Sequence, residues 1–134
     1  MKRLIAAAIL PALFATGALA QSVTDEVQMQ LWCGTAMVVA FANPPPGLTE
    51  AQLAEAQGYV EAGTALIETA IQAHLAAGFT QEAADKIKAD IVPVVTEQVM
   101  GDGSNAEHTF EECLALLPGQ DAAPPPADAS SSAM

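Results

Sequence analysis

The segment Leu31-Trp32-Cys33 holds the first of only two cysteines in the chain and its single tryptophan; the second cysteine is Cys113. Cys33 lies in the first helical segment of the sequence and Cys113 in the last, so a bond between them would close nearly the whole fold into one loop. Two cysteines allow one intramolecular pairing, and disulfides persist in exported proteins. The sequence has no Cys-x-x-Cys motif and no lysine or arginine beside either cysteine to activate a thiol. We therefore predict a structural disulfide between Cys33 and Cys113.

The first twenty residues have the pattern of a secretory signal peptide. Lys2 and Arg3 form a charged start, residues 4–14 are apolar, and Ala18-Leu19-Ala20 is the small-residue pattern that a signal peptidase cuts after. The apolar run contains a proline and is shorter than the ~20 residues of a membrane-spanning helix. We therefore expect cleavage of residues 1–20, a periplasmic or extracellular protein, and no stable membrane insertion after cleavage. An uncleaved membrane anchor is the alternative.

The chain that would remain after cleavage is strongly acidic. Two lysines stand against sixteen acidic residues, which gives a net charge of −14, and no arginine is left. Nucleic acids and anionic lipid surfaces are bound mainly through lysine and arginine, and arginine is the preferred partner of phosphate and carboxylate ligands. The composition therefore argues against nucleic-acid, membrane-surface and nucleotide partners.

The apolar pattern predicts helices and no strand. A helix from about residue 22 to residue 42 is apolar on nearly every face, which is typical of a central helix surrounded by its neighbours. A second helix over residues 49–77 begins with a capping box formed by Thr49 and Gln52. Small residues recur along it every seven positions and should let a neighbouring helix come close; they are Ala56, Gly63, Ala70 and Ala77.

The second half of the chain predicts two more helices. The third begins at Thr80 and continues toward the turn at residue 101, and Pro93 inside it should kink the helix or split it in two. The fourth should open with a capping box of Ser104 and Glu107 and end before residue 118. We therefore predict an all-α fold for residues 21–118: a small antiparallel four-helix bundle with up-down-up-down topology, joined at its first and last helices by the disulfide. Residues 119–134 should form a disordered tail rich in Ala, Pro and Ser.

The two histidines are the candidates for a metal or cofactor. His74 has no second ligand nearby, so it is expected to be a helix-end histidine packed at the edge of the core rather than a zinc ligand. His108 and Met37 could form a haem pair, but a helical His108 would lie about 140° round the helix from Cys113, and no Cys-x-x-Cys-His motif exists. We therefore predict no metal and no cofactor, and the role of either histidine stays open.

The sequence offers no catalytic residues. The serines near the helices, Ser22 and Ser104, are explained as helix caps, and the paired carboxylates fall on polar helix faces. A hydrolytic triad needs a nucleophile, a base and an orienting group within reach of one another. The turn at Asp102 lacks the spacing and final glutamate of a calcium loop. The protein is therefore not expected to be an enzyme.

Two functions follow from the predicted architecture. The first is a binding or interaction protein for an unidentified protein or a small apolar ligand, because a bundle with an apolar first helix can open a groove; no ligand-binding residue can be assigned from the sequence. The second is an envelope stress role. A small exported helical protein with one disulfide between early and late helices resembles, in layout alone, the acid-stress chaperones of the periplasm. The resemblance implies a chaperone that acts when acid neutralises its sixteen carboxylates.

Overall fold

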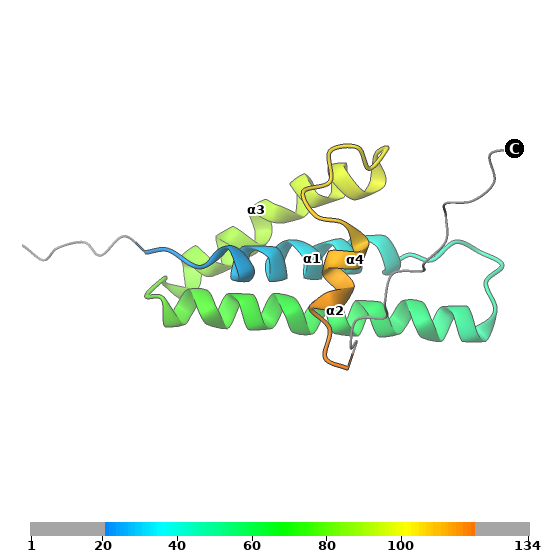
Figure 1. Ribbon diagram of the computed structural model, residues 1–134, viewed down its shortest axis with the longest axis horizontal. Coiled ribbons are helices and arrows are strands. Elements are labelled where there is room, and N and C mark those ends of the chain that lie inside the picture. The colour runs from blue at the N-terminus through cyan, green and yellow to red at the C-terminus, as the bar shows by residue number, and fades with distance from the viewer. Residues whose placement is uncertain (1–20, 120–134) are drawn as a thin grey trace, which may run out of the picture.

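The computed structural model describes residues 21–119, and these form four α-helices and no strand (Figure 1). The helices are α1 (Asp25–Phe41), α2 (Glu50–Ala76), α3 (Gln81–Met100) and α4 (Phe110–Ala115). The predicted all-α fold is confirmed for this part of the chain. The predicted signal peptide, residues 1–20, and all but the first residue of the predicted tail at 119–134 lie outside the described residues.

Each helix begins with a threonine cap whose hydroxyl accepts a hydrogen bond from the backbone N–H three residues later; the caps are Thr24, Thr49, Thr80 and Thr109. Such side chains replace the hydrogen bonds that the first turn of a helix lacks. The predicted capping box of Thr49 and Gln52 is confirmed, with the Thr49 amide donating to Gln52 Oε1 at 3.0 Å.

The start of the fourth helix was placed too early by the sequence pattern. Ser104 does not cap a helix, because its backbone amide and its hydroxyl both donate to Asp102 Oδ1, at 2.9 and 2.6 Å. That pairing closes a local turn, which is a common alternative to helix for Asp and Ser. The capping box that does form joins Thr109 and Glu112. His108 therefore precedes α4 and does not lie in its first turn.

α1 and α2 run antiparallel and side by side (Figure 1), and their backbones touch where Gly34 faces Gly63. The small-residue stripe predicted for the second helix is confirmed at three of its four positions, because Ala56, Gly63 and Ala70 are buried. Ala77 is exposed at the end of the helix. Small side chains in this stripe let the two helices pack closely along their length.

The core is built around α1, which contacts α2, α3 and α4. Its buried side chains include Leu31, Trp32 and Met37. They pack against buried residues of α2 and α3, including Leu66, Ile67, Ala70, Ala84 and Val95. The central position expected for the first helix is thus confirmed.

The alternating direction of all four helices is not confirmed. α4 has only six residues, and in Figure 1 it runs across the α1–α2 pair, while α3 diverges from that pair at an angle. Pro93 lies inside a continuous α3, so the predicted kink at that residue stays a prediction. No helix within residues 21–119 is both long enough and apolar enough to cross a membrane.

The disulfide between Cys33 and Cys113 is present, as predicted, and it spans 80 residues of chain. Cys33 lies in the middle of α1 and Cys113 in the short α4, with their Cα atoms 5.2 Å apart. Among the helices, α4 makes its main contacts with α1 alone. The bond therefore holds the last helix against the central one, and it positions the loop that leads into α4.

Candidate functional site: an aromatic pocket beside the disulfide

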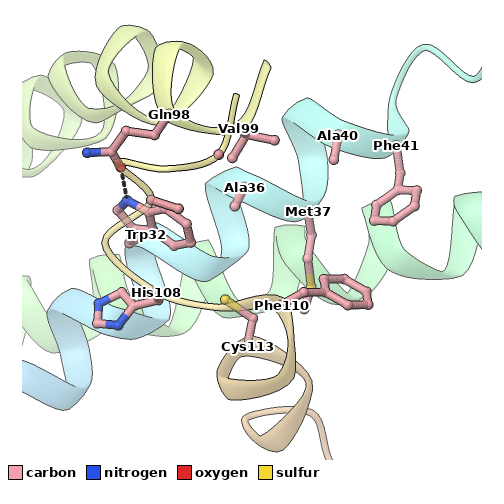
Figure 2. A pocket seen from close by; sticks show the side chains of 12 residues that line it. Trp32, Ala36, Met37, Ala40, Phe41, Gln98, Val99, His108, Phe110 and Cys113 are labelled. Carbon is pink, nitrogen blue, oxygen red and sulfur yellow. Dashed lines mark hydrogen bonds between the residues drawn. The ribbon is translucent and has the colours of Figure 1, made fainter. Parts of the chain in front are cut away.

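A pocket of about 210 Å³ lies beside the disulfide (Figure 2). It is bounded by α1, by the end of α3, by the loop over residues 101–109 and by α4. Its walls are mainly apolar and include Trp32, Met37, Phe41, Val99, Phe110 and Cys113. We call this cavity the aromatic pocket.

The α1 wall of the aromatic pocket follows from helical periodicity. Trp32, Ala36 and Ala40 are spaced four residues apart, and so are Met37 and Phe41, so all five lie along neighbouring rows of one helix face. The two alanines are small and leave a hollow between the larger side chains. The space exists because that hollow lies opposite the loop and is not filled by another helix.

Trp32 is fixed in this wall by a polar contact and an aromatic one. Its indole N–H donates to Gln98 Oε1 of α3 at 2.8 Å, and its ring meets the ring of His108 edge-on with centroids 5.4 Å apart. The side chain is 5% exposed. A buried tryptophan normally requires a partner for its N–H, and here that partner sets the angle of the ring that forms one side of the pocket.

An aromatic cluster stands at the other end of the pocket. Phe41 and Tyr59 stack with centroids 4.7 Å apart, and Phe110 packs edge-on against Tyr59 at 5.6 Å. Figure 2 shows Phe41 and Phe110 at this end, on the side away from Trp32. Phe110 is 48% exposed.

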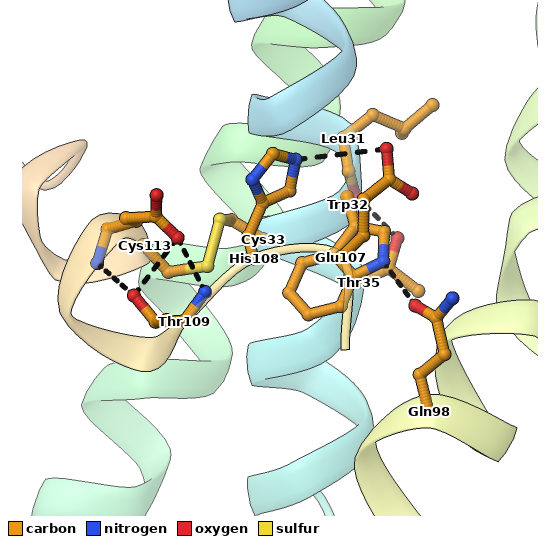
Figure 3. The surroundings of a disulfide bond; sticks show 10 residues. Leu31, Trp32, Cys33, Thr35, Gln98, Glu107, His108, Thr109 and Cys113 are labelled. Atoms are coloured by element: carbon orange, nitrogen blue, oxygen red, sulfur yellow. Dashed lines mark hydrogen bonds and ion pairs between the residues drawn. A yellow bond between two sulfur atoms is a disulfide. The ribbon is translucent and has the colours of Figure 1, made fainter. Parts of the chain in front are cut away.

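The loop and α4 place carboxylates next to the apolar walls (Figure 3). Glu107 Oε1 lies 4.0 Å from His108 Nε2. The backbone amide and hydroxyl of Thr109 donate to Glu112, at 2.7 and 3.0 Å, and these hydrogen bonds lower the pKa of the Glu112 carboxyl, with a smaller effect from His108. Hydrogen bonds from Ser104 likewise lower the pKa of Asp102. None of these three carboxylates lines the aromatic pocket itself.

The structure brings together Met37 and His108, which the predicted helix geometry had placed on different faces. The predicted separation of Met37 and His108 requires a helical His108. His108 lies before α4, and both side chains lie on walls of the aromatic pocket. The pocket is nevertheless smaller than the roughly 300–1,000 Å³ of sites that hold cofactors and drug-sized ligands. Within residues 21–119, no group of three or more His, Cys, Asp or Glu side chains is arranged to hold a metal.

His74 lies in a different part of the fold, near the end of α2. It is 4% exposed, its Nδ1 is 2.7 Å from the carbonyl oxygen of Ala70, and its ring packs edge-on against Phe79. It shares no wall with the aromatic pocket.

Sequence reasoning missed the contributions of α3 and of the loop. Gln98 is 66 residues away from Trp32, and no periodic pattern links the two positions. The sequence holds one signal for this region. The indole N–H of the lone tryptophan needs a hydrogen-bond acceptor, and the predicted disulfide at the next residue brings the chain around Cys113 close to Trp32. That signal could identify the region but not the particular residue.

No protein-family model, curated protein or solved structure matches this chain. The candidate site therefore rests on its own geometry.

Proposed function

We propose that this chain is an exported binding protein whose aromatic pocket holds a small apolar molecule about the size of one substituted aromatic ring. The observation that supports this proposal is the 210 Å³ cavity itself, with its mainly apolar walls and its hydrogen-bonded tryptophan. An engineered apolar cavity of about 150 Å³ is large enough to bind benzene, so a slightly larger molecule suits this one. The other lining residues are mainly apolar, which favours a mainly apolar occupant.

Export to the periplasm or the outside of the cell is part of the same proposal. It is supported by the signal pattern in residues 1–20 and by the disulfide, since such bonds form and persist in oxidising compartments. The proposed activity is reversible binding without catalysis.

The test is a nuclear magnetic resonance titration of the oxidised protein, exported with its own signal, using toluene as the probe. We expect saturable shifts of the Trp32 indole N–H and of the Phe41 amide. Ala36→Phe places a ring in the pocket and should abolish these shifts. Ala54→Phe, on an exposed position of α2, is the matched control and should leave them unchanged. An absence of saturable shifts in the unsubstituted protein would reject the proposal.

A second candidate is an envelope stress protein that holds partly unfolded clients at acidic pH. The observation that favours it is a set of exposed apolar side chains on α3: Val92 is 43% exposed, Val94 49% and Met100 68%. A client-aggregation assay at neutral and acidic pH tests it. Suppression that appears on acidification and is weakened by Val92→Ser with Val94→Ser would support this role, and no suppression at either pH would reject it.

A further inference from the structure

A second cavity, of about 410 Å³, lies where residues 21–23 and α1 meet the end of α2 and the first half of α3. This volume falls within the range of roughly 300–1,000 Å³ that is typical of small-molecule sites. Apolar side chains make up much of its wall, among them Leu31, Phe79, Ile87 and Ile91. It shares Trp32 with the aromatic pocket but no other residue. We call it the His74 pocket.

The ring of His74 is held in one orientation. Its Nδ1 lies 2.7 Å from the carbonyl oxygen of Ala70. A carbonyl oxygen can only accept a hydrogen bond, so the Nδ1 atom must carry a proton. The edge-on contact with Phe79, at a centroid distance of 5.1 Å, fixes the plane of the ring.

The other ring nitrogen is Nε2, and His74 lines this pocket. Nε2 has no hydrogen-bond partner among the described residues. In the same part of the chain, every fully buried side-chain nitrogen or oxygen has a hydrogen-bond partner. A fully buried Nε2 without a partner would be an exception, so Nε2 keeps some accessible surface. We place that surface in this pocket because His74 lines it. In the neutral imidazole, a ring nitrogen without a proton is a hydrogen-bond acceptor.

An acceptor in a cavity whose wall is mainly apolar, with Gln21, Ser22, Gln28 and Glu107 at its polar part, limits the chemistry of its occupant. From this geometry we infer that the His74 pocket binds a small phenol-like alcohol: an apolar, ring-sized body with one hydroxyl that donates to His74 Nε2. Glu107, an exposed residue that also lines the pocket, disfavours an anion. This site is separate from the one in the proposed function, and the two can fail independently.

The test compares two probes of nearly equal shape, 4-ethylphenol and 4-ethyltoluene, of which only the first carries a hydroxyl. We expect the protein to bind 4-ethylphenol about tenfold more tightly, the effect of roughly one hydrogen bond. His74→Phe keeps a planar ring but removes the acceptor, and should reduce the ratio of the two affinities to about one. Ile87→Trp should fill the pocket and weaken both probes. Ala36→Phe, which closes the aromatic pocket, should leave the preference for 4-ethylphenol intact.

A direct measurement on the unsubstituted protein tests the inference even if a variant fails to fold. The ¹⁵N resonance of His74 Nε2 should move when 4-ethylphenol binds and stay in place with 4-ethyltoluene. The inference is overturned if the two probes bind equally, if the preference survives His74→Phe, or if the His74 resonance does not respond to 4-ethylphenol. Because Ala36→Phe blocks only the aromatic pocket, loss of toluene binding there and loss of 4-ethylphenol binding here are distinguishable.

Discussion

Gly34 and Gly63 bring the backbones of α1 and α2 into direct contact. A Cβ atom at position 34 would stand 2.6 Å from the carbonyl oxygen of Gly63, and one at position 63 would stand 2.7 Å from the carbonyl oxygen of Gly34. Both obstacles are backbone atoms, which cannot rotate out of the way. The glycine pair therefore sets the distance between α1 and α2.

The glycine contact predicts opposite effects for two similar substitutions in α2. Gly63→Ala should lower the free energy of unfolding by about 1–3 kcal/mol, the usual cost of overpacking. Gly58→Ala is the matched control: a Cβ there meets nothing, so the substitution should raise stability by about 1 kcal/mol through helix propensity. Chemical denaturation of both variants checks this. Equal effects of the two substitutions would contradict the close approach.

The disulfide predicts a large and shared loss of stability. Cys33→Ala and Cys113→Ala should each lower the free energy of unfolding by about 4.5 kcal/mol, as the chain-entropy estimate gives for a closed loop of 80 residues. The double variant should lose no more than either single variant, because all three lack the same bond. Thermal melts of the three proteins provide the measurement, and additive losses would show that the cysteines act separately.

The hydrogen bond from Trp32 to Gln98 predicts a cost when its acceptor is removed. Gln98→Leu leaves a nearly buried indole N–H without a partner and should cost about 1–3 kcal/mol of stability. Gln98→Glu keeps an acceptor oxygen and should stay closer to the unsubstituted protein. Denaturation can be followed by the fluorescence of Trp32, the only tryptophan in the chain. Equal stability of both variants and the unsubstituted protein would show that this hydrogen bond is not formed.

The lowered pKa of Glu112 predicts a pH dependence at the start of α4. Because the carboxyl binds protons less readily in the folded state, its stabilising effect is complete above the ordinary pKa of 4.5 and is lost as the pH falls through the lower folded value. Glu112→Gln keeps the capping box but cannot titrate. The stability advantage of the glutamate over this variant should therefore shrink below pH 4.5, as measured by thermal melts across that range. A constant difference would contradict the assignment.

The helices were predictable to the extent that their signals are local. The Thr49–Gln52 capping box and the small residues at positions 56, 63 and 70 act within a few turns of one helix, and the structure confirms them. The fourth helix was misplaced because Ser104 and Glu107 have the spacing of a capping box, yet Asp102 binds Ser104 first. Ser104 could form either a turn with Asp102 or a capping box with Glu107, and the spacing of the residues does not show which of the two is more stable.

By itself, the sequence determined the all-α class, the identity of the central helix and the pairing of Cys33 with Cys113, because apolar periodicity and the count of cysteines need no knowledge of distant contacts. Only the tertiary structure decided where the cavities lie. The contact of Trp32 with Gln98, and the position of His74 in the wall of a pocket, depend on how α3 and the loop before α4 sit against α1. Those positions result from the sum of many weak packing contacts between residues far apart in the chain, and no single segment encodes them.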